Sequence, residues 1–401
     1  MQVTRQITND ITYVGVSDRR LSLFENIFPI PRGVSYNSYI INDEKTALID
    51  AVDYDSSRVF VENVKAALNG KTLDYIVVNH MEPDHAGSLR LICDHYPDAA
   101  LVATKKAVDM MAQFFGDELK NEKIVVKEGD TVSLGKHELS FYTAPMVHWP
   151  EVMVTYESFE KVLFSADAFG TFGALNGNIF NDEYDIDRDW LPDYRRYYTN
   201  ICGKYGMQVQ SLLKKALTLD IQMICPLHGP VWRSNLVYII NKYDIWSKYE
   251  AEGNSVMIAY ASIYGNTENA AYYLANELSK LGVKDIAMYD VSSTDVSYLI
   301  SETFRCSHIV LMSATYNLEI YPKMDDYISD MKRLNVSNKT FAIVDNGTWA
   351  PTAGKKMREA VETLKSCKIC ENTTTVKSAV NGSNAAALAA LAKEIAAEIQ
   401  G

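Results

Sequence analysis

The second part of the chain alternates strand-like and helix-like segments, and this rhythm limits the fold more than any other feature. A strand pattern over 255–261 is followed by a glycine turn and a helix pattern over 269–281. Further strand patterns cover 285–289 and 308–312. Strands that alternate with helices predict a doubly wound parallel sheet. The alanine-rich stretch 384–399 is expected to be a final helix, because alanine favours helices most strongly.

The first part of the chain has a different pattern. Up to about Lys248, short strand patterns are broken by turn residues, with helices between them. The change falls near residues 249–254, which are mostly polar. A length of 401 residues corresponds to two or three domains at about 150 residues each. We predict two domains, residues 1–250 and 255–401.

Charge and hydropathy exclude several classes of partner. The chain has 39 Lys and Arg against 51 Asp and Glu, a formal net charge of −12. So acidic a balance argues against nucleic acid and anionic membranes, which are bound by basic surfaces. The sequence shows no secretory signal and no apolar stretch of about 18 residues that could span a membrane. We therefore expect a cytoplasmic protein.

The cysteines do not form a framework. Six cysteines are too few for a disulfide scaffold in a chain of this length. Only Cys367 and Cys370 form a C-x-x-C pair. Such a pair can supply half of a tetrahedral metal site or a redox disulfide, but no second pair completes a four-cysteine site. We interpret them as two reduced thiols near a strand.

The sharpest signal is the run His80-Met81-Glu82-Pro83-Asp84-His85, directly after the strand pattern 73–79. An extended strand end would place the side chains at 80, 82 and 84 on one side, and His85 would join them through a turn. Four such donors cannot share one face without a cation that neutralises the carboxylates. The alternative interpretation is an exposed polar loop.

Three more donors follow later strand patterns, namely His148, Asp167 and His228. Four of the seven histidines of the chain are thus placed at strand ends. The other three occur in ordinary surface contexts, and we expect them to be solvated: His95, His137 and His308. The seven donors exceed the needs of one metal, and a shared carboxylate such as Asp167 suits two metals a few ångströms apart.

A loop in the second part has the features of a phosphate cradle. It lies between the 255–261 strand pattern and a helix, and it consists of Ser262, Ile263, Tyr264, Gly265, Asn266 and Thr267. Its hydroxyls and the N–H groups at the helix start can hold an anion. It lacks Lys and Arg, which suits a monophosphate, and it lacks the pattern of a triphosphate loop. The alternative is an ordinary strand–turn–helix connection.

The order H-x-E-x-D-H, then His, Asp and His, resembles the metallo-β-lactamase superfamily, whose zinc hydrolases have His at the position of Glu82. Glu82 followed by a flavodoxin-like domain resembles the flavodiiron proteins over nearly the whole chain. A carboxylate in place of an imidazole is a harder donor, which favours iron over zinc. The resemblance implies an α/β protein with an N-terminal metallo-β-lactamase-like αββα sandwich, followed by a flavodoxin-like doubly wound parallel sheet.

The resemblance also implies the roles of the residues. His80, Glu82 and His148 would hold one iron, Asp84, His85 and His228 the other, and Asp167 would bridge them. The 262–267 loop resembles the FMN phosphate loop of flavodoxins. Two later loops would then contact the flavin ring, formed by Ser313, Ala314, Thr315, Tyr316 and Asn317 and by Asn346, Gly347, Thr348 and Trp349.

These two ring-binding loops depart from the usual family pattern. Ala314 replaces a common proline, and Asn346-Gly347-Thr348-Trp349 replaces a run rich in Gly, Ser and Tyr. Tyr316 and Trp349 could stack on the isoalloxazine. FMN binding is still expected. The departures change which residues contact the flavin ring.

Two aromatic residues are candidates for a place beside the metals, Trp149 and Tyr198. The stretch 194–198 resembles the family's helix beside the diiron pocket, within a segment predicted to be helical over 194–217. The Tyr198 hydroxyl could give a hydrogen bond or a proton to a bound oxygen species. The alternative is a tyrosine that only packs the helix.

The resemblance implies an oxidoreductase that reduces O2 to water and/or NO to N2O, with electrons passed through FMN to a non-haem diiron site. Two electrons from the irons and two from the flavin match the four that O2 requires. The single C-x-x-C implies no rubredoxin-type module within this sequence, so an external donor is expected, such as rubredoxin or a reduced soluble cofactor. Family members pair head to tail, so we expect a homodimer or a dimer of dimers.

Two other functions are weighed against this one. A zinc-dependent hydrolase of the same superfamily, fused to a flavodoxin domain, is disfavoured by Glu82 and would be supported by bound zinc. A non-catalytic electron carrier or sensor would have lost some of the metal ligands, whereas all seven positions are filled here.

Overall fold

The computed structural model describes residues 3–400, which separate into two compact units. The first unit comprises the chain up to Tyr198 together with Met207–Asp244, and the second comprises Thr199–Gly206 together with the chain from Ile245 onward. Among residues 3–400, no helix has the length and apolar character that crossing a membrane requires.

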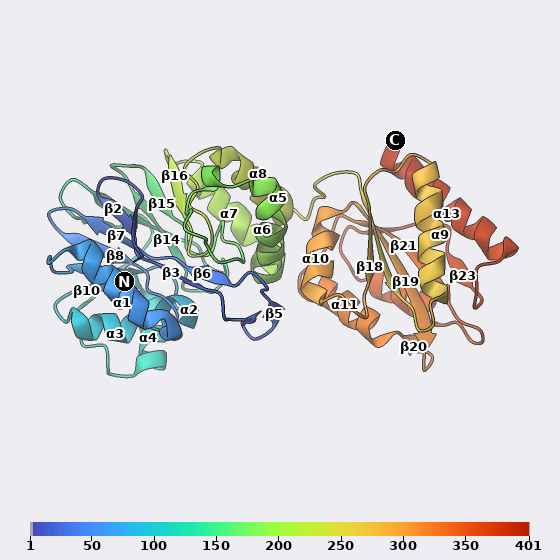
Figure 1. Ribbon diagram of the computed structural model, residues 1–401, viewed down its shortest axis with the longest axis horizontal. Coiled ribbons are helices and arrows are strands. Elements are labelled where there is room, and N and C mark those ends of the chain that lie inside the picture. The colour runs from blue at the N-terminus through green and yellow to red at the C-terminus, as the bar shows by residue number, and fades with distance from the viewer. Residues whose placement is uncertain (1–2, 401) are drawn as a thin grey trace. The chain divides into compact units, whose positions relative to one another are not determined.

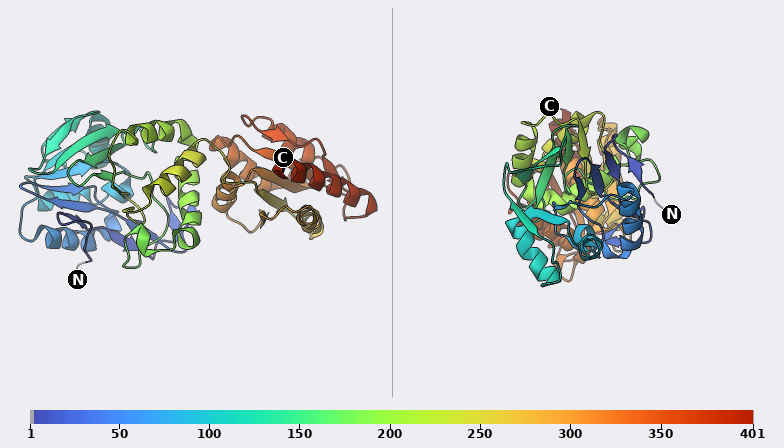
Figure 2. Two further views of the ribbon diagram at one scale, coloured as in Figure 1. Left: turned by 90° about the horizontal axis from the view of Figure 1, so that it is seen from above. Right: turned by 90° about the vertical axis from the view of Figure 1, so that its left-hand side faces the viewer.

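The first unit contains two large sheets, whose strands are blue to cyan and green in Figures 1 and 2. The first sheet has the order β1-β2-β7-β8-β9-β10-β11 and is parallel from β8 onward. Its strands are β1 (Arg5–Gln6), β2 (Ile11–Tyr13), β7 (Tyr39–Asn42), β8 (Thr46–Ile49), β9 (Tyr75–Val78), β10 (Ala100–Thr104) and β11 (Lys123–Val126).

The second sheet has the order β12-β13-β14-β15-β16 and is antiparallel except for its last pair. Its strands are β12 (Thr131–Ser133), β13 (Glu138–Thr143), β14 (Met153–Glu157), β15 (Val162–Phe164) and β16 (Met223–Cys225). Two further pairs are formed by β3 (Val16–Asp18) with β6 (Val34–Tyr36), and by β4 (Leu23–Phe24) with β5 (Phe28–Pro29). The large sheets meet through contacts such as the Tyr39 and Phe164 rings, whose centroids are 5.3 Å apart.

Helices flank these sheets (Figure 1). The first, α1, buries Phe60, Val64 and Leu68 on one face and ends at Asn69, whose left-handed conformation caps it. The helices of this part are α1 (Ser57–Leu68), α2 (Pro83–Ala86), α3 (Leu89–His95), α4 (Lys105–Phe115), α5 (Ile186–Asp189), α6 (Leu191–Tyr197), α7 (Gly206–Ala216) and α8 (Leu236–Ser247).

The helix predicted over 194–217 is not continuous. A π-helical turn over Tyr198–Cys202 and a 3-10 turn over Gly203–Tyr205 separate α6 from α7. A Cβ atom at Gly206 would lie 2.3 Å from the carbonyl oxygen of Ser247, so only glycine allows this close approach. The prediction of one unbroken helix was therefore wrong, because the chain changes its winding to make this contact.

The second unit is a parallel sheet of order β18-β17-β19-β21-β22. β17, its first strand in the sequence, lies between β18 and β19. This is the order 2-1-3-4-5 of a flavodoxin-like doubly wound sheet. The strands are β17 (Val256–Ala261), β18 (Ile286–Asp290), β19 (His308–Tyr316), β20 (Glu319–Ile320), β21 (Thr340–Asn346), β22 (Lys368–Ile369) and β23 (Thr374–Val376). β20 pairs antiparallel with β19. β22 pairs with the start of β21, and β23 pairs with the end of β21.

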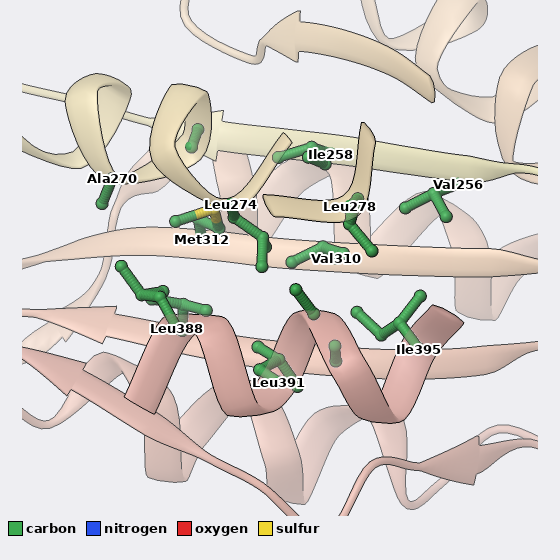
Figure 3. Close-up of a cluster of buried hydrophobic side chains, with 14 of the residues drawn as sticks. Val256, Ile258, Ala270, Leu274, Leu278, Val310, Met312, Leu388, Leu391 and Ile395 are labelled. Atoms are coloured by element: carbon green, nitrogen blue, oxygen red, sulfur yellow. The ribbon is translucent and has the colours of Figure 1, made fainter. Parts of the chain in front are cut away.

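Helices cover this sheet, and one side of its core is drawn in Figure 3. There, apolar side chains of β17 and β19 pack against α9 and α13, including Val256, Ile258, Val310, Met312, Leu274, Leu278, Leu388, Leu391 and Ile395. Each such fully buried side chain contributes about 1.5–3 kcal/mol to folding. The helices are α9 (Asn266–Lys280), α10 (Val296–Arg305), α11 (Pro322–Arg333), α12 (Ala353–Val361) and α13 (Gly382–Gln400).

Candidate metal centre and flavin pocket

The loop after β9 is anchored by hydrogen bonds of Asn79, the residue directly before the metal-binding donors. The backbone N–H and side-chain amide of Asn79 donate to the Asp50 carboxylate at 2.7 and 2.8 Å, and the Thr155 hydroxyl donates to Asn79 Oδ1. A helical turn, α2, begins at Pro83. The extended alternation expected over 80, 82 and 84 therefore stops at Glu82, and Asp84 projects from a helix.

Four of the predicted donors form a first group: His80, Glu82, His148 and Asp167. Glu82 Oε2 lies 3.3 Å from His80 Nε2 and 2.9 Å from His148 Nε2. Asp167 Oδ2 lies 3.1 and 3.3 Å from the same two nitrogens. Donor atoms from three separate segments of the sequence thus converge on one spot.

The remaining three donors form a second group: Asp84, His85 and His228. Asp84 Oδ2 lies 3.2 Å from the Nε2 atom of each histidine, and the two Nε2 atoms are 3.1 Å apart. The other oxygen of Asp167, Oδ1, lies 3.3 Å from His85 Nε2 and 3.5 Å from His228 Nε2. Asp167 thus presents one oxygen to each group.

Glu82 hydrogen-bonds His80 and His148, but two other carboxylates of this site lie close to imidazoles without being hydrogen-bonded. The carboxylate oxygens of Asp84 and Asp167 are buried and form no hydrogen bond within residues 3–400, although imidazole nitrogens lie 3.1–3.5 Å away. Buried polar atoms are normally paired. Atoms aimed at shared points rather than at one another are arranged as ligands are around cations, so these residues fit a site for two metal ions.

Charge within the site points the same way. Burial lowers the pKa of His85, but Asp84 and Asp167 outweigh burial and raise that pKa to about 10. Burial likewise opposes the charged form of His148, yet Asp167 and Glu82 raise its pKa to about 9. Protons thus neutralise the carboxylates when no metal does, and a metal must displace them to bind.

Outer partners orient the imidazoles. Glu151 Oε1 lies 2.8 Å from His80 Nδ1 and also accepts the Met81 N–H, and the Ser35 carbonyl lies 2.7 Å from His228 Nδ1. These contacts favour a proton on Nδ1 and leave Nε2 free to bind a metal. Sequence reasoning missed both partners. Glu151 was visible as an acid three residues after His148, whereas a backbone carbonyl leaves no signal.

Aromatic rings enclose the donors. The Trp149 ring stands edge-on to His80, with centroids 5.5 Å apart. Tyr197 and Phe24 each contact the His228 ring at 5.4 Å. Tyr198 is fully buried, and its ring packs on Tyr243 at 4.9 Å. Tyr36 also has a ring contact to His228, at 6.1 Å, and sequence reasoning did not single out Tyr197 or Tyr36.

A cavity of about 370 Å³ opens onto two of the carboxylates, Glu82 and Asp84. The hairpin between β4 and β5 forms part of its wall, including Glu25. Burial, followed by repulsion from Glu82, raises the pKa of Glu25 to about 8. Glu25 is a further functional candidate that the sequence did not reveal, because no motif surrounds it.

The other three histidines divide. His95 is exposed, as predicted. The expectation that His137 and His308 are solvated was wrong, since their exposed fractions are 0% and 7%. His137 directly precedes β13 and His308 begins β19, and distant segments cover both, with Asp10 beside His137 and Glu398 beside His308. Short sequence windows do not show such contacts. Cys367 and Cys370 are free thiols on either side of β22.

The second unit has a cavity of about 310 Å³ at the carboxyl ends of β17, β19 and β21, where doubly wound sheets bind ligands. Most predicted loop residues line it: Ser262, Ile263, Tyr264, Asn266, Thr267, Ala314, Thr315, Asn317, Asn346, Gly347, Thr348 and Trp349. Leu318 and Ser378 line it as well and were not predicted. Ser378 follows β23 in a loop that has no recognisable motif.

Three predicted residues do not line this cavity. Gly265 precedes α9 with φ +86°, which favours glycine. The Ser313 hydroxyl donates to the Ala314 carbonyl and accepts the Tyr321 N–H. Tyr316, the last residue of β19, packs on Tyr321, with ring centroids 6.1 Å apart. Its stacking on a flavin stays a prediction.

Side-chain hydrogen bonds join the loops around the cavity. Gly265 N–H donates to Ser262 Oγ at 3.0 Å. Asn346 Nδ2 donates to Thr267 Oγ1 at 3.2 Å and to the Ser378 carbonyl at 3.1 Å. The cradle is thus preformed from neutral groups, as expected for a monophosphate held by N–H and hydroxyl donors.

Comparisons with known proteins show which proteins this chain resembles. Residues 34–229 match the family described as ODP family beta lactamase. An uncharacterised protein of Methanocaldococcus jannaschii is 31% identical over 90% of this chain and 89% of its own length. An anaerobic nitric oxide reductase flavorubredoxin of Vibrio vulnificus is 32% identical over 86% of this chain and 70% of its own length.

The fold comparison covers nearly the entire molecule. The rubredoxin oxygen:oxidoreductase of Desulfovibrio gigas superposes with a TM-score of 0.92 at 26% identity, over 99% of this chain and 98% of that protein. The predicted succession of a metallo-β-lactamase-like and a flavodoxin-like fold is confirmed. Given this match and the identity to flavorubredoxin, the chain belongs to the flavodiiron protein family of oxidoreductases.

Proposed function

We propose that this protein reduces O2 to water and/or NO to N2O, with electrons passed through FMN to a non-haem diiron site. The observation that carries the proposal is the pair of donor groups that share Asp167, with one carboxylate oxygen near each. Relatives are named for both activities, as anaerobic nitric oxide reductase flavorubredoxin and as rubredoxin oxygen:oxidoreductase. Neither name favours one substrate for this chain.

The seven donors would hold two irons. His80, Glu82 and His148 are assigned to one, Asp84, His85 and His228 to the other, and Asp167 to both. Bound iron supplies the Lewis acidity and the electrons that reduction of a diatomic requires. The support is the distance set and the unpaired Asp84 and Asp167 oxygens described above. Three carboxylates among seven ligands suit iron better than zinc.

The chain's own residues prepare this site. Glu151 and the Ser35 carbonyl hold Nδ1 of His80 and His228, which keeps each Nε2 directed at the metal position. The cavity above Glu82 and Asp84 is walled in part by Leu23 and Phe24. Glu25 and Asp53 line it as well, so the cavity should repel anions and admit small uncharged ligands. Trp149 packs over His80 and limits water access from its side.

FMN would bind in the cavity of the second unit. Its phosphate would lie against Ser262, the N–H groups around Gly265 and Thr267, where α9 begins. Trp349 and Tyr264, which line the cavity and are 74% and 92% exposed, are the aromatic residues available for the ring. The assignment makes residues 1–250 the diiron domain and 255–401 the FMN domain.

Electrons would come from a separate protein such as rubredoxin or from a reduced soluble cofactor. We also propose a head-to-tail homodimer or a dimer of dimers, in the cytoplasm. The partners therefore include a second copy of the chain, an electron donor, and O2 and/or NO as substrate.

The test begins with elemental analysis of anaerobically purified protein, with flavin quantified in the same sample. We expect about two irons and one FMN per chain. Reduced rubredoxin should then support consumption of O2 or NO, measured with electrodes in separate assays. Zinc without iron, after growth with iron available, would indicate a hydrolase instead. FMN alone, without metal or turnover, would indicate an electron carrier.

A further inference from the structure

A second group of potential ligands lies in the first unit and shares no residue with the metal centre. It consists of His137, Glu157 and Glu160, whose donor atoms all lie within 4.8 Å of one another. His137 is in the turn between β12 and β13, Glu157 ends β14, and Glu160 is in the turn before β15. Antiparallel pairing of β13 with β14 brings these two turns together.

The His137 ring is placed as a metal ligand would be. Its exposed fraction is 0%, as is that of Glu157. Nε2 lies 3.3 Å from Asp10 Oδ2. Nδ1 points into the cluster, where Glu157 Oε1 is 2.9 Å away, yet Nδ1 forms no hydrogen bond within residues 3–400. A carboxylate on one ring nitrogen and an unsatisfied opposite nitrogen are the arrangement of an imidazole that binds metal.

Charge around the cluster calls for a cation. The Glu157 carboxylate is fully buried and accepts the N–H groups of Phe159 and Glu160 at 2.7 and 2.8 Å. Within the described part of the chain, no lysine or arginine pairs with Glu157 or Glu160, and Lys136 pairs with Asp10 instead. A buried carboxylate is costly unless a positive charge compensates it. Lys136 lies over the neighbouring Phe159 ring but is paired with Asp10, so His137 and a bound ion are the positive charges that can contact Glu157 directly.

We propose that His137 Nδ1, Glu157 and Glu160 bind a divalent cation of the zinc class. One imidazole and two carboxylates form a donor set that zinc accepts, with water completing the coordination. The ion would join the β12–β13 turn to the β14–β15 turn. It would also fix the N-terminal segment, because the Thr8 hydroxyl hydrogen-bonds Glu160 and Asp10 contacts His137. The site is structural and lies outside the proposed redox function.

The experiment uses full-length protein that has first been loaded with iron under anaerobic conditions. The protein is then incubated with zinc chloride and desalted, and zinc and iron are counted separately by mass spectrometry. We expect Glu160→Gln to retain about one zinc per chain less than the wild type, with equal iron. His137→Gln should show the same loss. Glu160 is chosen because it is only partly buried, so that its loss leaves the fold intact.

Glu138→Gln is the matched control, because this exposed neighbour contributes only backbone groups to its surroundings. It should retain zinc like the wild type. Zinc should also raise the thermal midpoint of the wild type and of this control, but not that of Glu160→Gln. Zinc that merely replaces iron would lower the iron count equally in all variants. Equal zinc retention in wild type and Glu160→Gln, or none in either, overturns the proposal and makes the cluster a buried ion pair.

Discussion

The metal centre of the first unit and the flavin pocket of the second differ in the kind of group that each one buries. The first gathers ionisable side chains, of which His80, His85 and Asp167 are 0–1% exposed. The second uses neutral hydroxyls, amides and backbone groups on open loops, and Tyr264 and Trp349 at its rim are 92% and 74% exposed. One site concentrates charge in the interior, and the other contains almost none.

This difference determines how each site depends on its ligand. The flavin loops satisfy one another through hydrogen bonds such as Asn346 to Thr267, so they hold their shape by themselves. The Asp84 and Asp167 carboxylates have no such partners and need either protons or cations. Metal binding should therefore stabilise the first unit strongly, whereas FMN binding adds its free energy to a site already formed.

The largest expected effect comes from Asp167→Ala. Each oxygen of Asp167 lies beside a different donor group, so its loss removes a ligand from both metal positions. We expect iron affinity to fall more than about a hundredfold at both, since even outer partners of metal ligands are worth 10–100-fold. FMN content should not change. Iron and flavin are measured on the same sample.

Asp94→Ala is the control for this variant, because Asp94 is an exposed residue of the same unit with a side chain 61% accessible. It should keep both irons and FMN. Circular dichroism establishes that each variant is folded. One tightly held iron in Asp167→Ala, with turnover preserved, would show that Asp167 does not bridge. Loss of FMN along with iron would show that the two sites are not independent.

Glu151→Gln is expected to have a smaller effect on the same site. Glu151 does not reach the metal position, but its carboxylate lies 2.8 Å from His80 Nδ1 and is fully buried. The amide keeps the shape and removes the charge that orients the imidazole. Iron affinity should fall about 10–100-fold, measured by competition with a chelator. Unchanged affinity would mean that the ring is held by packing alone, and Glu138→Gln again serves as the exposed control.

Much of the second unit could be predicted because its strands and helices follow from the sequence pattern of short segments. Strand, glycine turn and helix follow each other within short windows, and β17 and α13 occur where these windows placed them. The break between α6 and α7 was not predictable in this way. It depends on Gly206 meeting the backbone of Ser247, a contact between residues that no short window contains.

The sites show the same division between local and distant information. The six-residue run from His80 to His85 indicated a metal site because it contains four potential ligands. Glu151, the Ser35 carbonyl and Ser378 remained hidden, since each acts through a contact with a distant segment. His137 was misjudged for the same reason, because its burial arises from the pairing of β13 with β14.

Thr267→Val tests the flavin side of the comparison with the smallest change. The substitution keeps the shape of a side chain that is 2% exposed and removes the hydroxyl that accepts from Asn346 Nδ2. Losing one hydrogen bond costs about 0.5–1.5 kcal/mol, so the Kd for FMN should rise up to about tenfold. Fluorescence titration of flavin-free protein measures this Kd. Thr375→Val, at an exposed position on β23, is the matched control.

Because the metal centre of the first unit is formed by its own charged side chains, iron content should stay at the wild-type value in both variants. A loss of iron in Thr267→Val would contradict the view that the metal centre depends on its own ions while the flavin pocket is preformed.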